Sequence, residues 1–158
     1  MLRLLGPAAM AIALLAAACS SGEGEERDLG GGTATGQGLT QTAEVGGVTV
    51  EATWLTADGL GGLEADVGTY PLEDFVLVEI GFTTHSGDLN EIDMGEAASL
   101  TQAGMDVRPE AWVTTDDDAH HREGVLVFPR DLEDGPVELT IDMGDGVLAL
   151  TWESVPGA

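Results

Sequence analysis

The sequence contains a single cysteine, Cys19, among its 158 residues. One thiol cannot form a disulfide within the chain, although an extracytoplasmic compartment would permit one. Zinc sites made from four cysteines, or from two cysteines and two histidines, are excluded for the same reason. The fold must therefore be held by the burial of apolar side chains, which suffices for a domain of about 100 residues.

Positive charge is also scarce. Lysine is absent, and five arginines oppose 29 aspartates and glutamates, so the formal net charge is −24. Such a surface repels nucleic acid and anionic membrane surfaces, which excludes both as partners. It favours cations: metal ions, cationic ligands or basic partner proteins. Solubility by itself can also explain an acidic composition, so the net charge does not indicate which of these partners binds.

Sequence signatures of enzymes are missing. Ser86 follows His85 but lacks the G-x-S-x-G pattern of a nucleophile elbow. The sequence has no Walker loop, no dinucleotide fingerprint and no H-E-x-x-H motif. Carboxylates are abundant, but no two of them stand out as a glycosidase pair. We therefore predict that the protein is not an enzyme.

A long apolar run occurs once, from Leu4 to Ala18, directly after Arg3. A helix of this length spans about 22 Å, less than the roughly 30 Å core of a bilayer. A positive residue, a short apolar run and small residues before a polar stretch are typical of a secretory signal. We therefore predict a signal peptide over residues 1–18.

The run ends in LAAAC, residues 15–19, which resembles the lipobox of bacterial lipoproteins. The resemblance implies that Cys19 is lipidated, becomes the mature N-terminus and anchors the protein to a membrane of the cell envelope, on an extracytoplasmic face. More than one acyl chain gives stable anchoring. A lipidated Cys19 excludes a cysteine nucleophile and a blue-copper site, which needs a thiolate. The alternative is an ordinary secretory signal that happens to contain a cysteine.

Two parts follow the signal. Residues 19–44 are rich in Gly, Ser, Thr, Glu and Gln, so we predict a lipidated Cys19 followed by a flexible acidic tether. Residues 45–156 hold short apolar runs separated by turn residues, without a sustained helical period. This pattern predicts a single antiparallel β-sandwich, immunoglobulin-like or cupredoxin-like. The expected strands lie within 48–55, 74–84, 97–109 (a hairpin turning near Ala103–Gly104), 122–129, 136–144 and 146–153.

All three histidines fall at the ends of predicted strands, where sandwiches carry binding sites. His85 follows the run 74–84, and His120 and His121 precede the run 122–129. If these strand ends meet at one pole of the sandwich, the imidazoles converge with carboxylates such as that of Asp88. Imidazole combined with carboxylate suits zinc or copper(II). The sequence therefore predicts a copper or zinc site formed by His85, His120, His121 and Asp88.

The same residues have a structural interpretation. A histidine that closes a strand commonly hydrogen-bonds a neighbouring loop, and the hydroxyls of Thr84 and Ser86 can cap a turn. Adjacent residues of a regular strand point to opposite faces, so His120 and His121 bind one metal only from a loop or bulge. The aspartates 116–118 do not match a calcium loop, and we expect them in a solvated acidic loop.

THSGDL at 84–89, a downstream tryptophan and HHREGVLVFP at 120–129 together resemble a family of small exported bacterial proteins. Members combine a Thr-His-Ser stretch with a Trp and a His-His-Arg-x-Gly-x-Leu-x-Phe run, and the similarity covers roughly residues 48–153. Where glycines are expected before the histidine pair, this chain has Asp118 and Ala119. The resemblance implies a common role, which it does not specify, for His85, Ser86, Trp112, His120, His121 and Arg122.

Two functions are consistent with these observations. The first is an extracytoplasmic, lipid-anchored binding module that captures or passes on a copper or zinc ion. The second is a module for protein–protein interaction or envelope assembly, in which the histidines only brace the loops.

Overall fold

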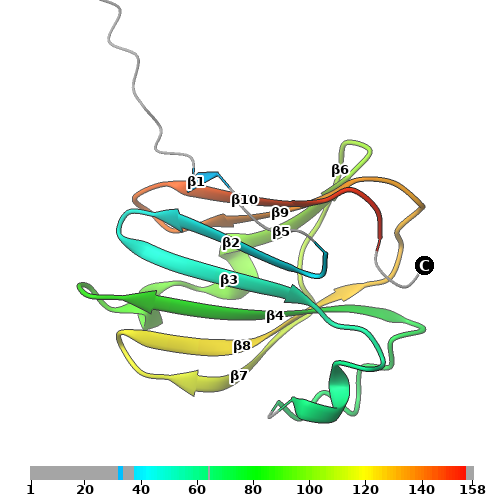
Figure 1. Ribbon diagram of the computed structural model, residues 1–158, viewed down its shortest axis with the longest axis horizontal. Helices are drawn as coiled ribbons and strands as arrows, with labels where there is room; N and C mark the ends of the chain where they lie inside the picture. The colour runs from blue at the N-terminus through cyan, green and yellow to red at the C-terminus, as the bar shows by residue number, and fades with distance from the viewer. Residues whose placement is uncertain (1–31, 34–37, 64, 156–158) are drawn as a thin grey trace, which may run out of the picture.

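The computed structural model describes residues 32–33, 38–63 and 65–155. Within this part of the chain, ten strands form two five-stranded sheets that pack face to face (Figure 1). Sheet A has the order β1-β10-β9-β5-β6, and sheet B has the order β2-β3-β4-β8-β7. Their pairings are antiparallel, except that the short β1 runs parallel to β10. The predicted all-β sandwich is confirmed.

The strands of the predicted runs begin and end within two residues of the expected limits. The strands of sheet A are β1 (Gly32–Thr33), β5 (Ala98–Gln102), β6 (Met105–Val107), β9 (Val137–Asp142) and β10 (Val147–Trp152). Those of sheet B are β2 (Thr40–Val45), β3 (Val48–Trp54), β4 (Phe75–Thr84), β7 (Ala111–Asp117) and β8 (His121–Pro129).

Three short helices lie in the connections: η1 (Leu60–Gly62), η2 (Leu89–Glu91) and α1 (Met94–Ala97). In the part of the chain that the structure describes, no helix has the length and apolar character needed to cross a membrane.

Two predicted boundaries differ from the structure. β1, paired with β10, and the start of β2 lie inside the range 19–44 predicted as tether. β2 forms because Ala43 and Val45 alternate with polar residues and bury one face of the strand. β7 extends to Asp117, so the first two aspartates of 116–118 end a strand instead of lying in a loop. The predicted signal over 1–18, Cys19 and residues 20–31 lie outside the described residues.

Two hairpins turn through residues with positive φ. Gly46 and Gly47 join β2 to β3 with φ of 59° and 79°, and Ala103 and Gly104 join β5 to β6 with φ of 50° and 81°. Positive φ at both central residues is the requirement of a type I′ turn, which matches the twist of antiparallel strands. The turn predicted at Ala103–Gly104 is confirmed.

The main core fills the space between the sheets. Alternate residues of each strand point inward, such as Val50 and Ile80 from sheet B and Leu139 and Leu150 from sheet A, and all four are fully buried. Trp54 of sheet B meets Trp152 of sheet A edge to face, with 5.5 Å between their ring centroids.

A second, smaller core lies on the outer face of sheet B. Leu77, Val125 and Val127 point away from sheet A, and residues of the connection between β3 and β4, including Leu55 and Val67, cover them. The run 74–84, which forms β4, is apolar on nearly both faces. The structure shows why: one end of its outer face is buried under its own connecting segment.

Trp112 of β7 packs over Gly124 of β8, and this contact needs a residue without a side chain. A Cβ atom at Gly124 would lie 2.6 Å from the Trp112 ring and 2.6 Å from the backbone oxygen of Val113. Gly81, on the neighbouring strand β4, is different, because its Cβ would come no closer than 3.8 Å to Glu123 Oε1.

We expect Gly124→Ala to lower the free energy of unfolding by about 1–3 kcal/mol, because the ring and the strand must move apart. Gly81→Ala is the matched control and should leave stability unchanged or slightly raised, because glycine weakens a strand interior. Chemical denaturation of both variants checks this. Equal stability of the two variants would contradict the assigned packing.

Candidate functional site

Three loops meet at one end of the sandwich: the β2–β3 turn, the segment after β4 and the β9–β10 turn (Figure 1). Between them lies a pocket of about 670 Å³, which we call the pole pocket. No arginine or histidine lines it, and its lining includes six acidic residues: Asp88, Glu91, Asp93, Glu96, Asp142 and Asp145. Negative charge and a concave surface therefore coincide at this pole.

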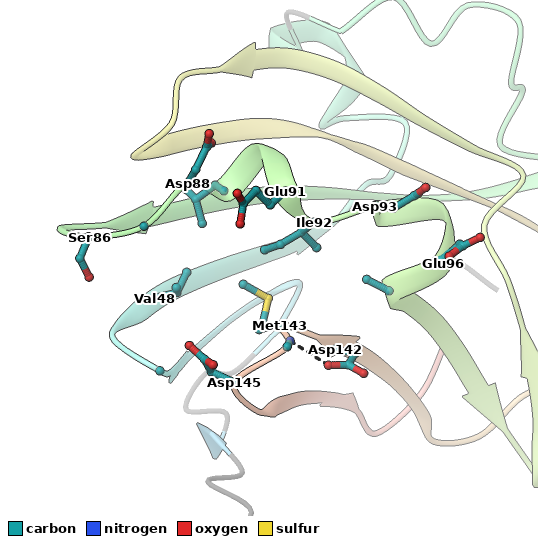
Figure 2. A pocket seen from close by; sticks show the side chains of 15 residues that line it. Val48, Ser86, Asp88, Glu91, Ile92, Asp93, Glu96, Asp142, Met143 and Asp145 are labelled. Atoms are coloured by element: carbon teal, nitrogen blue, oxygen red, sulfur yellow. Dashed lines mark hydrogen bonds between the residues drawn. The ribbon is translucent and has the colours of Figure 1, made fainter.

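The floor of the pole pocket is apolar. Figure 2 shows the Met143 side chain between Val48 and Ile92, with acidic side chains placed around them. All three floor residues pack against the main core, so the floor belongs to the rigid part of the molecule. A ligand in the pocket would meet apolar surface below and carboxylates at the rim.

Three of the rim aspartates also shape the loops that carry them. Asp88 Oδ1 accepts a hydrogen bond from the Asn90 N–H at 3.0 Å and caps η2, and Asp93 Oδ1 does the same for α1 through Gly95. Asp142 Oδ1 accepts from the Gly144 N–H at 2.9 Å in the β9–β10 turn. Each of these bonds uses one carboxylate oxygen and fixes the loop that carries the aspartate.

Arg122 fixes the wall of the pole pocket from inside. Its Nη1 donates to the backbone oxygens of Leu89 at 2.9 Å and Ile92 at 2.7 Å, which are the two ends of the η2 segment. Its guanidinium lies 5.4 Å from the centre of the Trp112 ring. The Nε of Arg122 and the indole N–H of Trp112 are buried, and neither has a hydrogen-bond partner among the described residues.

The strand ends next to the histidines are joined to each other mainly by backbone hydrogen bonds. The Thr84 N–H donates to the oxygen of His120 at 3.0 Å, and the Leu89 N–H donates to the oxygen of Ala119 at 2.9 Å. The Thr84 hydroxyl donates to the Ser86 oxygen and accepts from the Ser86 N–H. The Thr84 hydroxyl therefore braces the turn after β4, as the structural interpretation of THS expects.

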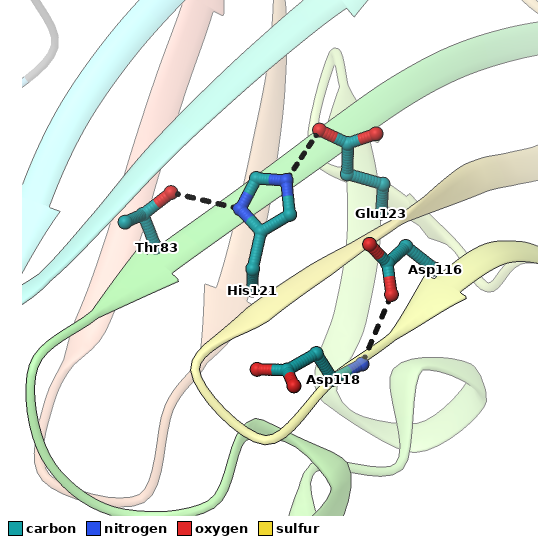
Figure 3. A network of polar contacts seen from close by, with 5 residues as sticks. All are labelled: Thr83, Asp116, Asp118, His121 and Glu123. Atoms are coloured by element: carbon teal, nitrogen blue, oxygen red, sulfur yellow. Dashed lines mark hydrogen bonds and ion pairs between the residues drawn. The ribbon is translucent and has the colours of Figure 1, made fainter.

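His121 is the histidine with side-chain partners. Its Nε2 lies 2.9 Å from Glu123 Oε1, and its Nδ1 lies 3.3 Å from the Thr83 hydroxyl (Figure 3). About half of each side chain of the His121–Glu123 pair is exposed, 47% and 46%. The pair lies on the outer face of sheet B, because β8 directs its odd-numbered residues away from sheet A.

The four predicted metal ligands do not form one cluster in the described part of the chain. Asp88 lines the pole pocket, and His121 pairs with Glu123 on the outer face of sheet B. His85 and His120 are exposed in the loops next to these strands. Residues 32–33, 38–63 and 65–155 contain no group of three or more His, Cys, Asp or Glu that could hold a metal ion. Metal binding stays a prediction, and the predicted convergence is not seen.

The acidic residues that complete the pole pocket were missed at the sequence level. Asp88 was a predicted ligand, but Glu91, Glu96, Asp142 and Asp145 were not singled out, because they lie on loops separated by about 50 residues. The sequence did place some of these acidic residues in turn-forming stretches, such as MGDG at 143–146, and this could have indicated that they lie on loops at one end of the sandwich.

Comparison with protein-family models, with curated proteins and with solved structures gives no match for this chain. What the fold and the site define is a class of architecture: a β-sandwich with an acidic pocket at one pole.

Carboxylates also gather beside His121, on the outer face of sheet B. Glu51, Gly81 and Glu123 occupy one row across β3, β4 and β8, and Glu79 lies in the adjacent row. Desolvation raises the pKa of the Glu79 carboxyl, and the negative charges of Glu123 and Glu51 raise it further.

A raised pKa means that the folded state binds the Glu79 proton more tightly than the unfolded state, so stability falls as pH rises above about 4.5. Glu79→Gln should therefore raise the free energy of unfolding at pH 7, and this gain should shrink as the pH falls below about 4.5 and Glu79 becomes protonated in both states. Urea unfolding across pH measures it. Glu44→Gln on β2 controls for the loss of one charge, and an equal gain there would contradict a local origin.

Proposed function

We propose that this protein is a lipid-anchored, extracytoplasmic binding module whose pole pocket accepts a cationic ligand with an apolar part. One observation carries the proposal. Six carboxylates surround a floor of Val48, Ile92 and Met143, and no basic residue lines the pocket.

Electrostatics favours a cation at this pole. The acidic residues that line the pocket come from several sides of it, and their negative charges attract a bound positive charge. The chain as a whole carries a net charge of −24, so a cation is also attracted from a distance and arrives faster. Binding should weaken as salt is added, because the acidic residues of the rim are exposed. Dissolved ions screen the attraction between exposed charges over a Debye length of about 8–10 Å at physiological salt.

The pocket's size and floor restrict the ligand further. A volume of about 670 Å³ lies within the range of sites for small organic molecules. The apolar floor favours a ligand that places alkyl or aromatic groups beside its charge, as peptides with lysine or arginine next to leucine do. An inorganic cation would leave the floor unused.

The binding test uses a short peptide of alternating arginine and leucine, titrated by calorimetry. We expect Glu91→Gln combined with Asp145→Asn to weaken binding about two- to thirtyfold, because each of the two exposed charge pairs contributes about 0.2–1 kcal/mol. A peptide in which glutamate replaces arginine should not bind.

The matched control is Glu73→Gln combined with Asp58→Asn. It removes the same charges from a second pocket, of about 520 Å³, at the opposite pole. If both double variants weaken the arginine–leucine peptide equally, general charge and not the pole pocket explains the binding, and the proposal fails.

The His121–Glu123 pair favours a second candidate function, the binding of a copper or zinc ion. The imidazole and carboxylate are in contact at 2.9 Å and half-exposed, so both can reach a metal ion. A site with two protein ligands, completed by water, would bind more weakly than the four-ligand site predicted from the sequence.

For this second candidate, Zn²⁺ or Cu²⁺ should raise the melting temperature of the purified protein, and His121→Ala should abolish the increase. His85→Ala and His120→Ala should keep it, since neither side chain belongs to the pair. Scanning calorimetry of each variant with and without metal measures these changes in melting temperature. An increase that survives His121→Ala would refute this assignment, and so would unchanged melting of the unaltered chain.

A further inference from the structure

The strand β1 begins at the end of the sandwich that carries the pole pocket. β1 runs parallel to β10, with Gly32 paired to Leu148 and Thr33 to Ala149 (Figure 1). β10 itself begins at Val147, directly after the turn that contributes Met143 and Asp145 to the pole pocket. Gly32 therefore lies at the pocket end of the sandwich.

The chain between Gly32 and the predicted lipid is short. Residues 20–31 separate Cys19 from Gly32. Even fully extended, the chain from Cys19 to Gly32 spans no more than about 47 Å, at up to 3.6 Å per residue. β4 has ten residues, so the sandwich is about 33 Å long in the strand direction, at about 3.3 Å per residue. An anchor at Cys19 therefore keeps the pole pocket closer to the bilayer, on average, than the opposite pole around Asp58.

The bilayer surface does not suit the pocket as its ligand. Anionic lipid headgroups and the rim carboxylates repel each other within about 8–10 Å. A soluble cation would gain nothing from the anchor, since it reaches a free or an anchored pocket equally well. A partner held in the same membrane does gain, because two molecules confined to one surface meet at a raised effective concentration. This higher effective concentration compensates for weak individual contacts between a ligand and the exposed rim of the pocket.

We propose that the anchored protein presents its pole pocket to the membrane side, and that the ligand is a basic segment of a membrane-embedded partner close to the bilayer. This inference rests on the proposed function, since it assumes a lipid at Cys19 and a cationic ligand in the pole pocket.

The orientation is tested on the lipidated full chain in phosphatidylcholine vesicles that carry a headgroup dye. Cys19 is the sole cysteine and would carry the lipid, so one introduced cysteine can be labelled. Energy transfer to the dye should be stronger from Asp145→Cys than from Asp58→Cys. A long Gly/Ser insertion before Gly32 should reduce the difference. Equal transfer from both labels, or stronger transfer from Asp58→Cys, overturns the inference.

The partner is tested with a transmembrane peptide that has lysines and arginines next to its apolar segment, reconstituted in the same vesicles. We expect the lipidated chain to reach half-saturation at a concentration at least tenfold lower than the Cys19→Ser chain without lipid. Glu91→Gln with Asp145→Asn should remove most of this binding. A version of the peptide with glutamine in place of the basic residues is the control and should not bind.

The outcomes separate the two levels of the proposal. If the unlipidated chain binds the basic peptide and the lipid adds nothing, the membrane-side inference fails while the cationic pocket stands. If neither form binds the basic peptide, the proposed function fails, and the inference fails with it. If the unlipidated chain binds vesicles of anionic lipid without any peptide, the occupant is the bilayer and the inference is overturned.

Discussion

The guanidinium of Arg122 connects the core of sheet B to the loop that forms the wall of the pole pocket. Two hydrogen bonds from one nitrogen, to the oxygens of Leu89 and Ile92, hold both ends of a three-residue helical turn. Hydrogen bonds from a charged donor are stronger than neutral ones. The same side chain lies over Trp112, whose ring occupies the space that Gly124 leaves open. These contacts give Trp112 and Arg122, grouped by the sequence resemblance, a joint structural role.

The loops that line the pole pocket are fixed by hydrogen bonds. They are held by helix caps, by Arg122 and by the backbone hydrogen bond from Leu89 to Ala119. The rim of the pole pocket therefore keeps six acidic residues around an apolar floor. Preorganised charge of this kind binds a complementary cation without first ordering the loops. The second core on sheet B stiffens the same sheet at its other end.

β1, β2 and β7 were not among the expected strands. The other strands and their alternation could be predicted from the sequence, because burial at every second residue is a local signal. The hairpin at Ala103–Gly104 and the two-sided burial of β4 belong to this class. Convergence of the histidines was predicted from the sequence and is not seen in the described residues, because it depends on which face each strand end presents. His121 lies in β8 on the outer face of sheet B, so its ring meets Glu123 and Thr83. The pole pocket joins three loops that are distant in sequence, and only the pairing of the strands brings them together.

The central claim is that the pole pocket is the binding site, and residue-level mapping by NMR tests it most directly. The ¹⁵N-labelled protein would be titrated with the arginine–leucine peptide while amide chemical shifts are followed. The account predicts that the largest changes fall in three segments, 46–48, 86–97 and 142–145. Changes centred on residues 55–58 and 72–73, or spread evenly over the acidic surface, would contradict it.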